Sequence, residues 1–141
     1  MSDTSDTSDA APGGDPRATE EVLAARAALA DAVDAALRAA GLPVLREEFG
    51  DSGVQVWVDA KADALGGVYA RWKISAEMNQ AVIACVRERR MDDPLIRRRG
   101  EVGAAMNEAV LRVLVASGFG ADHFADDFVS PCVRLTAGPP R

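Results

Sequence analysis

The amino-acid sequence predicts an α+β fold, in which an antiparallel sheet of about four strands packs against three helices in the order α-β-β-β-α-α-β. Two observations support this prediction. Residues 53–75 alternate apolar and polar side chains with a period of two, which is typical of half-buried strands. Residues before and after this segment repeat their apolar side chains with the period of an amphipathic helix. Because strands and helices occur in separate runs, the helices are expected on one face of the sheet.

The chain has 141 residues, which fits a single folded domain. Residues 1–17 are mostly small, polar and acidic and include Pro and Gly, and such a segment cannot bury enough apolar surface to offset the entropy lost on ordering. We therefore expect a disordered acidic tail over residues 1–17, a single α+β domain over residues 18–137 and a frayed C-terminus over residues 138–141.

The first helix is predicted over Glu20–Ala40, with Thr19 as its N-cap. Gly41 suits the position just after the last helical residue, and Pro43 cannot continue the helix. A weaker strand is predicted over Val44–Phe49, and the turn-forming residues that follow it lead into the alternating segment.

The alternating segment predicts two strands, over residues 53–59 and 67–75, joined by a short loop. The apolar residues of the two strands lie on the same face of the sheet only in every second pairing register. A shift of the pairing by one residue would move the side chains of one strand to the opposite face. Two such registers remain open: one places Trp57 opposite Tyr69, and the other places Trp57 opposite Arg71 in a cation–π contact. Trp72 falls on the apolar face and is expected in the core.

Two helices are predicted after the hairpin. Ser75 is the expected N-cap of the first, which runs to about Met91. Asp93 followed by Pro94 predicts a new helix and not a kink, because proline is favoured at the first helical position. This third helix is expected to end at Ser117.

The last part of the chain is predicted as a loop over Phe119–Asp127 followed by a strand over Phe128–Thr136. Pro131 has no N–H to donate to a neighbouring strand, so this strand is expected at a sheet edge or with a bulge. The succession of a helix, three strands and a further helix is similar to the architecture of small secretion chaperones. That resemblance concerns architecture alone and implies no function.

The net charge of −6 argues against two classes of partner. Asp3, Asp6, Asp9 and Asp15 contribute four negative charges ahead of the first basic residue, Arg17, so the remaining chain carries only −2. A protein that binds nucleic acid or an anionic membrane needs a basic surface excess, and neither partner is expected here.

The residue usage predicts a cytoplasmic bacterial protein. Fourteen of the 16 basic residues are arginine and alanine is abundant, which is typical of GC-rich bacterial genomes. Cys85 and Cys132 lie far apart and have no metal-ligand spacing, which favours a reduced compartment. The sequence has neither the pattern of a secretory signal peptide nor a run of 18 apolar residues.

The outer face of the two strands is the main candidate for a binding site. It carries Trp57, Tyr69, Arg71 and Lys73, and aromatic residues of this kind are enriched at interfaces. Three explanations for Trp57 remain open. The third helix or the last strand covers it, a second copy of the chain covers it, or it forms a platform for a ligand.

Two other segments carry functional side chains. Arg97, Arg98 and Arg99 are a candidate anion site, because guanidinium groups suit phosphate and carboxylate recognition. Nearby carboxylates favour a different interpretation, an exposed corner held by ion pairs. His123 is flanked by aspartates, and a carboxylate can orient an imidazole as a base. One histidine falls short of a zinc site, and no metal or cofactor is expected.

The sequence contains no recognisable catalytic nucleophile or phosphate-binding loop. We therefore expect a non-enzymatic interaction, chaperone-like or regulatory domain that binds a protein partner or a second copy of itself through the face of Trp57. The alternative is a protein or enzyme that binds a small anionic ligand through Arg71, Lys73 or the Arg97–Arg99 segment, with His123 as its base.

Overall fold

The computed structural model describes residues 16–47, 50–126 and 130–140, which form three helices and a five-stranded sheet. The predicted α+β class and the order of the predicted elements are confirmed, and β4 is an additional strand. Residues 1–15 of the predicted tail lie outside the described residues. The elements in chain order are α2 (Glu20–Ala39), β1 (Val44–Leu45), β2 (Gly53–Asp59), β3 (Gly67–Lys73), α3 (Ala76–Arg87), α4 (Pro94–Ala116), β4 (Gly120–Phe124) and β5 (Cys132–Ala137).

The sheet is mixed, and not purely antiparallel as predicted. Its strand order is β1-β2-β3-β5-β4, with β1 parallel to β2 and the other neighbouring pairs antiparallel. β1 pairs Val44 with Val54, so the chain must return to the same end of the sheet before β2 begins. The strand predicted over Val44–Phe49 is therefore only two residues long, and residues 48–49 lie outside the described residues.

The β2–β3 hairpin adopts the register that places Trp57 opposite Tyr69. This register gathers the apolar side chains of both strands on one face, as their alternation predicted. Trp72 also lies on this side, where it packs against the core while remaining half-buried. The fully buried members of this face are Val54, Val56, Val68 and Ala70.

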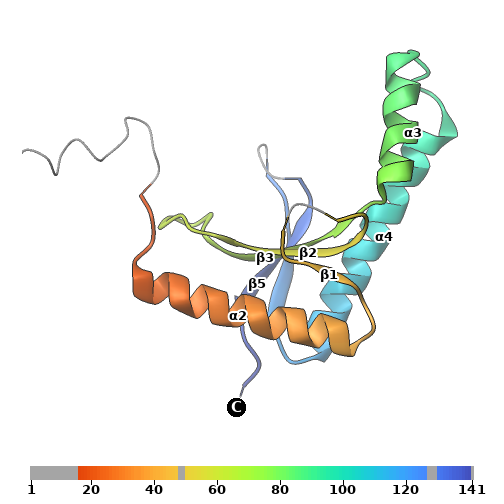
Figure 1. Ribbon diagram of the computed structural model, residues 1–141. Coiled ribbons are helices and arrows are strands. Elements are labelled where there is room, and N and C mark those ends of the chain that lie inside the picture. The colour runs from red at the N-terminus through yellow and green to blue at the C-terminus, as the bar shows by residue number, and fades with distance from the viewer. Residues whose placement is uncertain (1–15, 48–49, 127–129, 141) are drawn as a thin grey trace, which may run out of the picture.

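The hydrophobic core lies between this face of the sheet and two helices. α2 contributes Val33 and Leu37, and α4 contributes Val110 and Leu114, all fully buried. Figure 1 shows α2 running below the strands and α4 passing beside them. Because both helices bury their apolar residues against the same set of strand residues, the opposite face of the hairpin, which carries Trp57, has no helix packed on it within the described chain.

Three helix starts are formed by the predicted capping residues. The side-chain oxygens of Thr19, Ser75 and Asp93 accept hydrogen bonds from backbone N–H groups in the first turns of α2, α3 and α4. Each cap satisfies an N–H group that has no partner within its helix. Pro94 occupies the first turn of α4, as predicted.

The end of the chain differs from the prediction. Gly120–Phe124 forms the edge strand β4 and not a loop, and it pairs with β5. The sequence of β4 is short and polar, because only one face of the strand packs against the helix α4. It therefore lacks the apolar pattern that would have predicted a strand. β5 lies between β3 and β4, so the edge position considered for this strand is wrong. β5 begins at Cys132, and Pro131 stands just before it, so the missing N–H of the proline removes no hydrogen bond from the strand. Residues 127–129 lie outside the described residues.

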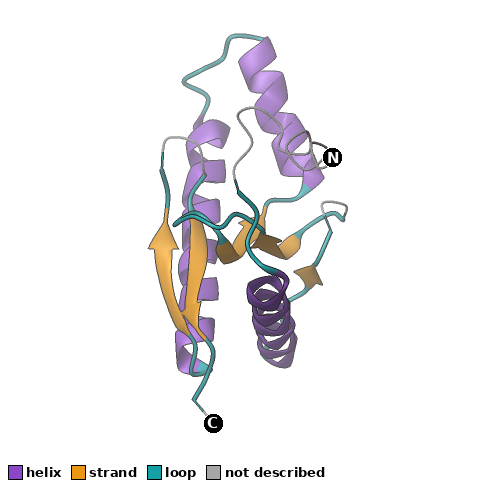
Figure 2. Ribbon diagram, turned by 90° about the vertical axis from the view of Figure 1, so that its left-hand side faces the viewer, coloured by secondary structure: helices purple, strands orange, loops and turns teal. Residues whose placement is uncertain are grey.

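α3 packs on α4 and not on the sheet. It ends at Arg87, earlier than the predicted Met91, and a turn connects it to Pro94. Figure 1 and Figure 2 show α3 and the first half of α4 standing beyond the end of the sheet. We call residues 76–102, which comprise α3, the turn and the first part of α4, the arm. No helix in the described parts of the chain is long and apolar enough to cross a membrane.

Arg89, just after α3, adopts a φ of 58° in the left-handed region. A side chain costs roughly 1 kcal/mol there relative to glycine. Arg89→Gly is therefore expected to raise the free energy of unfolding, measured by urea denaturation, by about 0.5 kcal/mol. The control is Arg98→Gly within α4, which is expected to lower it by about 1 kcal/mol, as glycine does in a helix interior. Equal losses from both changes would contradict the strain at Arg89.

Candidate functional site

The outer face of the hairpin carries a cluster of aromatic rings and guanidinium groups. The rings of Trp57 and Tyr69 stack with their centroids 5.5 Å apart and their planes 16° from parallel. Arg71, diagonal to Trp57 on the neighbouring strand, lies over the Trp57 ring at 5.5 Å from its centroid. The direct pair and the cation–π contact therefore occur together. β5 adds Arg134, which lies 5.8 Å from the Tyr69 ring centroid.

Tyr69 is a packing residue within this cluster. Its side chain and backbone are only 3% exposed, and its hydroxyl donates a hydrogen bond of 2.7 Å to the carbonyl of Leu65. Burial raises the pKa of the Tyr69 hydroxyl above its ordinary value, and the charge of Arg134 opposes this shift. Of the aromatic pair, Trp57 is consequently the one with surface left to offer a partner, since it is only half-buried.

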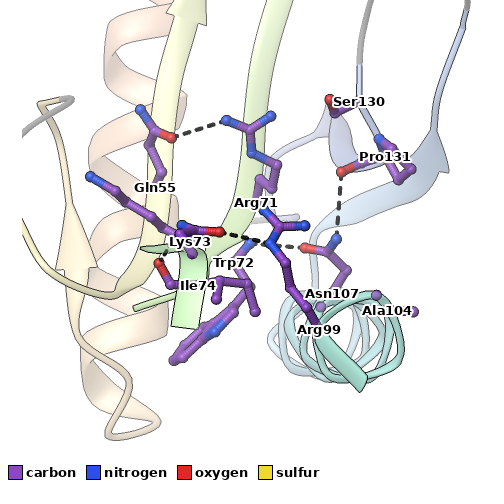
Figure 3. Close-up of a pocket in the computed structure, with 13 residues that line it drawn as sticks. Gln55, Arg71, Trp72, Lys73, Ile74, Arg99, Ala104, Asn107, Ser130 and Pro131 are labelled. Atoms are coloured by element: carbon purple, nitrogen blue, oxygen red, sulfur yellow. Dashed lines mark hydrogen bonds between the residues drawn. The ribbon is translucent and has the colours of Figure 1, made fainter. Parts of the chain in front are cut away.

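A groove of about 630 Å³ opens beside this cluster, where the end of β3, the start of α3 and the middle of α4 meet. Figure 3 shows Arg71 reaching into it from β3 and Arg99 from α4. Among the described residues that line it, Arg71, Lys73 and Arg99 carry a charge and none is a carboxylate. The remaining residues that line the groove are Gln55, Trp72, Ile74, Asn79, Gly100, Gly103, Ala104, Asn107, Ser130 and Pro131.

Neutral oxygens hold the two arginines of the groove. Arg99 Nε donates to Asn79 Oδ1 at 2.7 Å, and Arg71 donates to Gln55 Oε1 at 3.4 Å. Among the described residues, neither guanidinium forms an ion pair. Their positive charges are therefore positioned without being neutralised, which favours an anion in the groove.

The structure brings together residues from both sites that the sequence predicted. Arg71 and Lys73 come from the strand face, and Arg99 comes from the Arg-rich segment. Arg97 and Arg98 do not line the groove, because neighbouring positions on a helix point in different directions. Arg97 is instead 3.6 Å from Glu101 and its side chain is 79% exposed.

Small residues on α4 make room for the groove. A Cβ atom added to Gly100 would meet no atom within 4 Å, and one added to Gly103 would lie 3.9 Å from Ile74. Because Gly100, Gly103 and Ala104 have small side chains or none, they leave open space between α4 and Arg71. The two glycines therefore open space at the site and are not required for close contact between helices.

Asn107 is a residue of this site that the sequence gave no reason to select. Its Oδ1 accepts a hydrogen bond of 2.9 Å from the backbone N–H of Trp72, and its Nδ2 donates to the carbonyl of Pro131 at 3.4 Å. The side chain thus joins α4 to β3 and to the segment before β5 (Figure 3). A single polar residue on an amphipathic helix carries no sequence signal for such a role.

His123 pairs with a carboxylate that the sequence did not indicate. Its Nε2 lies 2.6 Å from Glu108 Oε2, and Arg112 Nε donates to the other oxygen of Glu108 at 3.0 Å. Asp122 does not take this role, because adjacent residues of a strand point to opposite faces. Glu108 and His123 line a second hollow of about 360 Å³ that adjoins the groove at Asn107.

The second hollow also contains a buried thiol. Cys132 lines it, but burial raises the pKa of its thiol above the ordinary value, which disfavours a thiolate nucleophile. Its Sγ donates to the carbonyl of Phe124 at 3.6 Å. Within the described chain, no three His, Cys, Asp or Glu residues stand where they would hold a metal ion.

Comparisons with known proteins find no matching family model, no similar curated protein and no similar solved structure.

Removing the side chain of Asn107 is expected to destabilise the protein. Asn107→Ala leaves the N–H of Trp72 without its partner, and the free energy of unfolding should fall by about 1–3 kcal/mol in urea denaturation. Asn107→Asp keeps a side-chain oxygen that can accept this hydrogen bond, so the free energy of unfolding should fall by less. Equal losses for the two variants would show that the bond to Trp72 does not stabilise the fold.

The Glu108 cluster predicts a loss of stability in acid. The hydrogen bond from His123, followed by that from Arg112, lowers the pKa of Glu108 below its ordinary value of 4.5. The contribution of Glu108 to the free energy of unfolding is therefore fully present above pH 4.5 and is lost as the pH falls through the lowered pKa. The difference in thermal midpoint between wild type and Glu108→Gln should shrink over this interval. A difference independent of pH would contradict the pairing.

Proposed function

We propose that this chain is a non-enzymatic interaction domain whose groove binds an acidic segment of a protein partner. The observation that carries the proposal is the convergence of Arg71, Lys73 and Arg99 on a groove whose described lining contains no carboxylate. Guanidinium groups already oriented by amide oxygens lose little freedom when they bind a carboxylate, so more of the interaction energy is retained as affinity.

The shape of the surface favours an extended polypeptide over a compact ligand. The groove adjoins a hollow of about 330 Å³ beside Trp57, with which it shares Gln55 and Arg71. At its other end it adjoins the hollow of His123, with which it shares Asn107. Small-molecule sites are usually single concave cavities that enclose most of their ligand. A row of three connected hollows suits a chain of several residues.

The two ends of this surface differ in chemistry. The hollow beside Trp57 includes Glu47, and its Arg46 is already held by Asp31 at 2.9 Å and by Asp34 at 3.3 Å. Acidic residues of the partner are therefore expected over the groove, and an apolar or aromatic residue is expected over Trp57. Tryptophan and arginine, the residue types of Trp57 and of the arginines in the groove, are both enriched at binding hot spots.

We place this interaction in the bacterial cytoplasm. Both cysteines are buried and unpaired in the described structure, which agrees with a reducing compartment. The preference for arginine over lysine supports a GC-rich bacterial origin.

A binding assay with a defined probe tests the proposal. An oligoglutamate peptide should change the tryptophan fluorescence, because Trp57 and Trp72 border the site. An oligoglutamine peptide of the same length should not. Arg71→Ala and Arg99→Ala should each weaken binding about tenfold, because each removes a hydrogen bond to a charged group. Arg98→Ala is the matched control on the same helix and should change the affinity less than about twofold.

Thermal shifts with phosphate and citrate separate this proposal from its alternative. Stabilisation by these small anions together with no response to oligoglutamate would favour a small anionic ligand instead. Equal weakening by Arg98→Ala and Arg99→Ala would indicate non-specific charge attraction and would contradict the groove.

A further inference from the structure

The described chain begins with a short pairing to the hairpin. The N–H of Ala18 donates to the carbonyl of Ala60, and the N–H of Ala62 donates to the carbonyl of Pro16, both at 2.8 Å. Figure 1 shows this start of the chain at the loop end of the hairpin, away from α4. The pairing therefore fixes the point from which residues 1–15 extend, and we call these residues the acidic N-terminal segment.

The acidic N-terminal segment contains a repeat of three residues. It reads Ser-Asp-Thr twice and then Ser-Asp, so Asp3, Asp6 and Asp9 are three positions apart. A polyproline II chain has three residues per turn and is a major conformation of unfolded chains. In that conformation, the three carboxylates would share one side of the chain. Because the segment contains no lysine or arginine, these carboxylates would form a row of negative charge that no basic side chain of the segment neutralises.

A turn signal separates this repeat from the start of the described chain. Residues 12–16 read Pro-Gly-Gly-Asp-Pro, and prolines and glycines clustered in this way are typical of turns. The bridge between Arg17 and Lys61 is antiparallel, so the chain enters it from the side away from the groove. A reversal over residues 12–16 would return residues 1–11 along the hairpin toward the groove.

The spacing of the aspartates matches the spacing of the cations along the hairpin. A polyproline II chain rises about 3.1 Å per residue, so Asp6 and Asp3 would lie about 19 and 28 Å beyond the turn. Arg71 and Lys73 pair with strand positions that precede Lys61 by six and eight residues, or about 20 and 26 Å. The two aspartates would therefore come level with the two cations.

The groove differs in charge from the other arginine-bearing surfaces of the described chain. Arg71 comes from β3 and Arg99 from the arm, and amide oxygens hold both without neutralising them. Several arginines elsewhere are already paired with carboxylates, namely Arg38, Arg46, Arg90, Arg97 and Arg112. The positive field of the groove is consequently the one that a row of carboxylates complements.

We propose that the acidic N-terminal segment binds back into the groove through Asp3 and Asp6, where it competes with the acidic partner for the same cations. This inference rests on the proposed function, because an internal competitor acts only on a groove that receives a partner. The covalent link keeps the segment near the groove at an effective concentration in the millimolar range, so a weak contact is enough to form. The segment thereby sets how acidic a partner must be to displace it.

Oligoglutamate binding to full-length variants tests the competition. Asp3→Asn, Asp6→Asn and Asp9→Asn combined, the repeat variant, should bind about threefold more tightly than wild type. This factor corresponds to a groove that the segment occupies about two thirds of the time.

The matched control removes the same three charges from positions beside the bridge. It combines Asp15→Asn with Glu20→Gln and Glu21→Gln, which change exposed residues in the first turn of α2. These positions are too close to the bridge to reach the groove, so the affinity of the control variant should equal that of wild type. Circular dichroism checks that α2 remains folded.

A zero-length cross-link tests the position of the segment. Lys61 and Lys73 are the two lysines of the chain, and a carbodiimide joins a lysine to a carboxylate in direct contact with it. After isolation of the monomer, mass spectrometry should find Lys73 joined to Asp3 or Asp6. A segment joined to Lys61 alone would overturn the proposal.

The internal contact and the proposed function fail in different ways. If the repeat variant, the control variant and wild type bind oligoglutamate equally, the internal contact is wrong and the proposed function stands. Equal tightening by the repeat and control variants would show a general effect of net charge and would also overturn the internal contact. If none of the three proteins binds oligoglutamate, the proposed function is wrong, and the competition that rests on it is wrong as well.

Discussion

The register of the β2–β3 hairpin determines which side chains form the core and which form the outer face of the sheet. With Trp57 opposite Tyr69, the valines of both strands face α2 and α4, and Trp57, Tyr69 and Arg71 lie on the opposite face. A slip of one residue would bring Arg71 into the core and expose the valines. The cost of burying an unpaired guanidinium makes that alternative inaccessible. The core and the proposed binding face are thus two results of one pairing.

The rotation of α4 about its axis provides the second half of the site. Val110 and Leu114 are buried in the core, so the side of the helix that they occupy must face the sheet. Asn107, Gly103 and Arg99 follow at intervals of three or four residues toward the N-terminus, and they continue this side beyond the last buried residue. The packing of α4 in the core consequently orients Arg99 toward Arg71, although neither arginine belongs to the core.

Local patterns were sufficient to predict most of the elements. Alternation identified β2 and β3, and the capping residues Thr19, Ser75 and Asp93 identified the helix starts, because both signals depend on neighbouring residues. β1 and β4 were misjudged because their strand character comes from partners elsewhere in the chain. β1 is held by parallel pairing with β2, and β4 by pairing with β5.

The candidate site was predictable in its residue types but not in its assembly. Arg71, Lys73 and Arg99 stood out as cations, yet only the path of the chain determines that Arg99, and not Arg98, meets the other two. Asn107 and Glu108 were missed for the same reason. Their partners, Trp72 and His123, are 35 and 15 positions away, and no short-range pattern connects them.

Arg99 gives the groove a property that its shape alone does not show. Two of its cations come from β3, and the third comes from α4, so the groove is formed by two elements that are far apart in the sequence. A chain of carboxylates that binds all three cations must hold these two elements together. Such a ligand stabilises the folded chain, because the groove does not exist when the chain is unfolded.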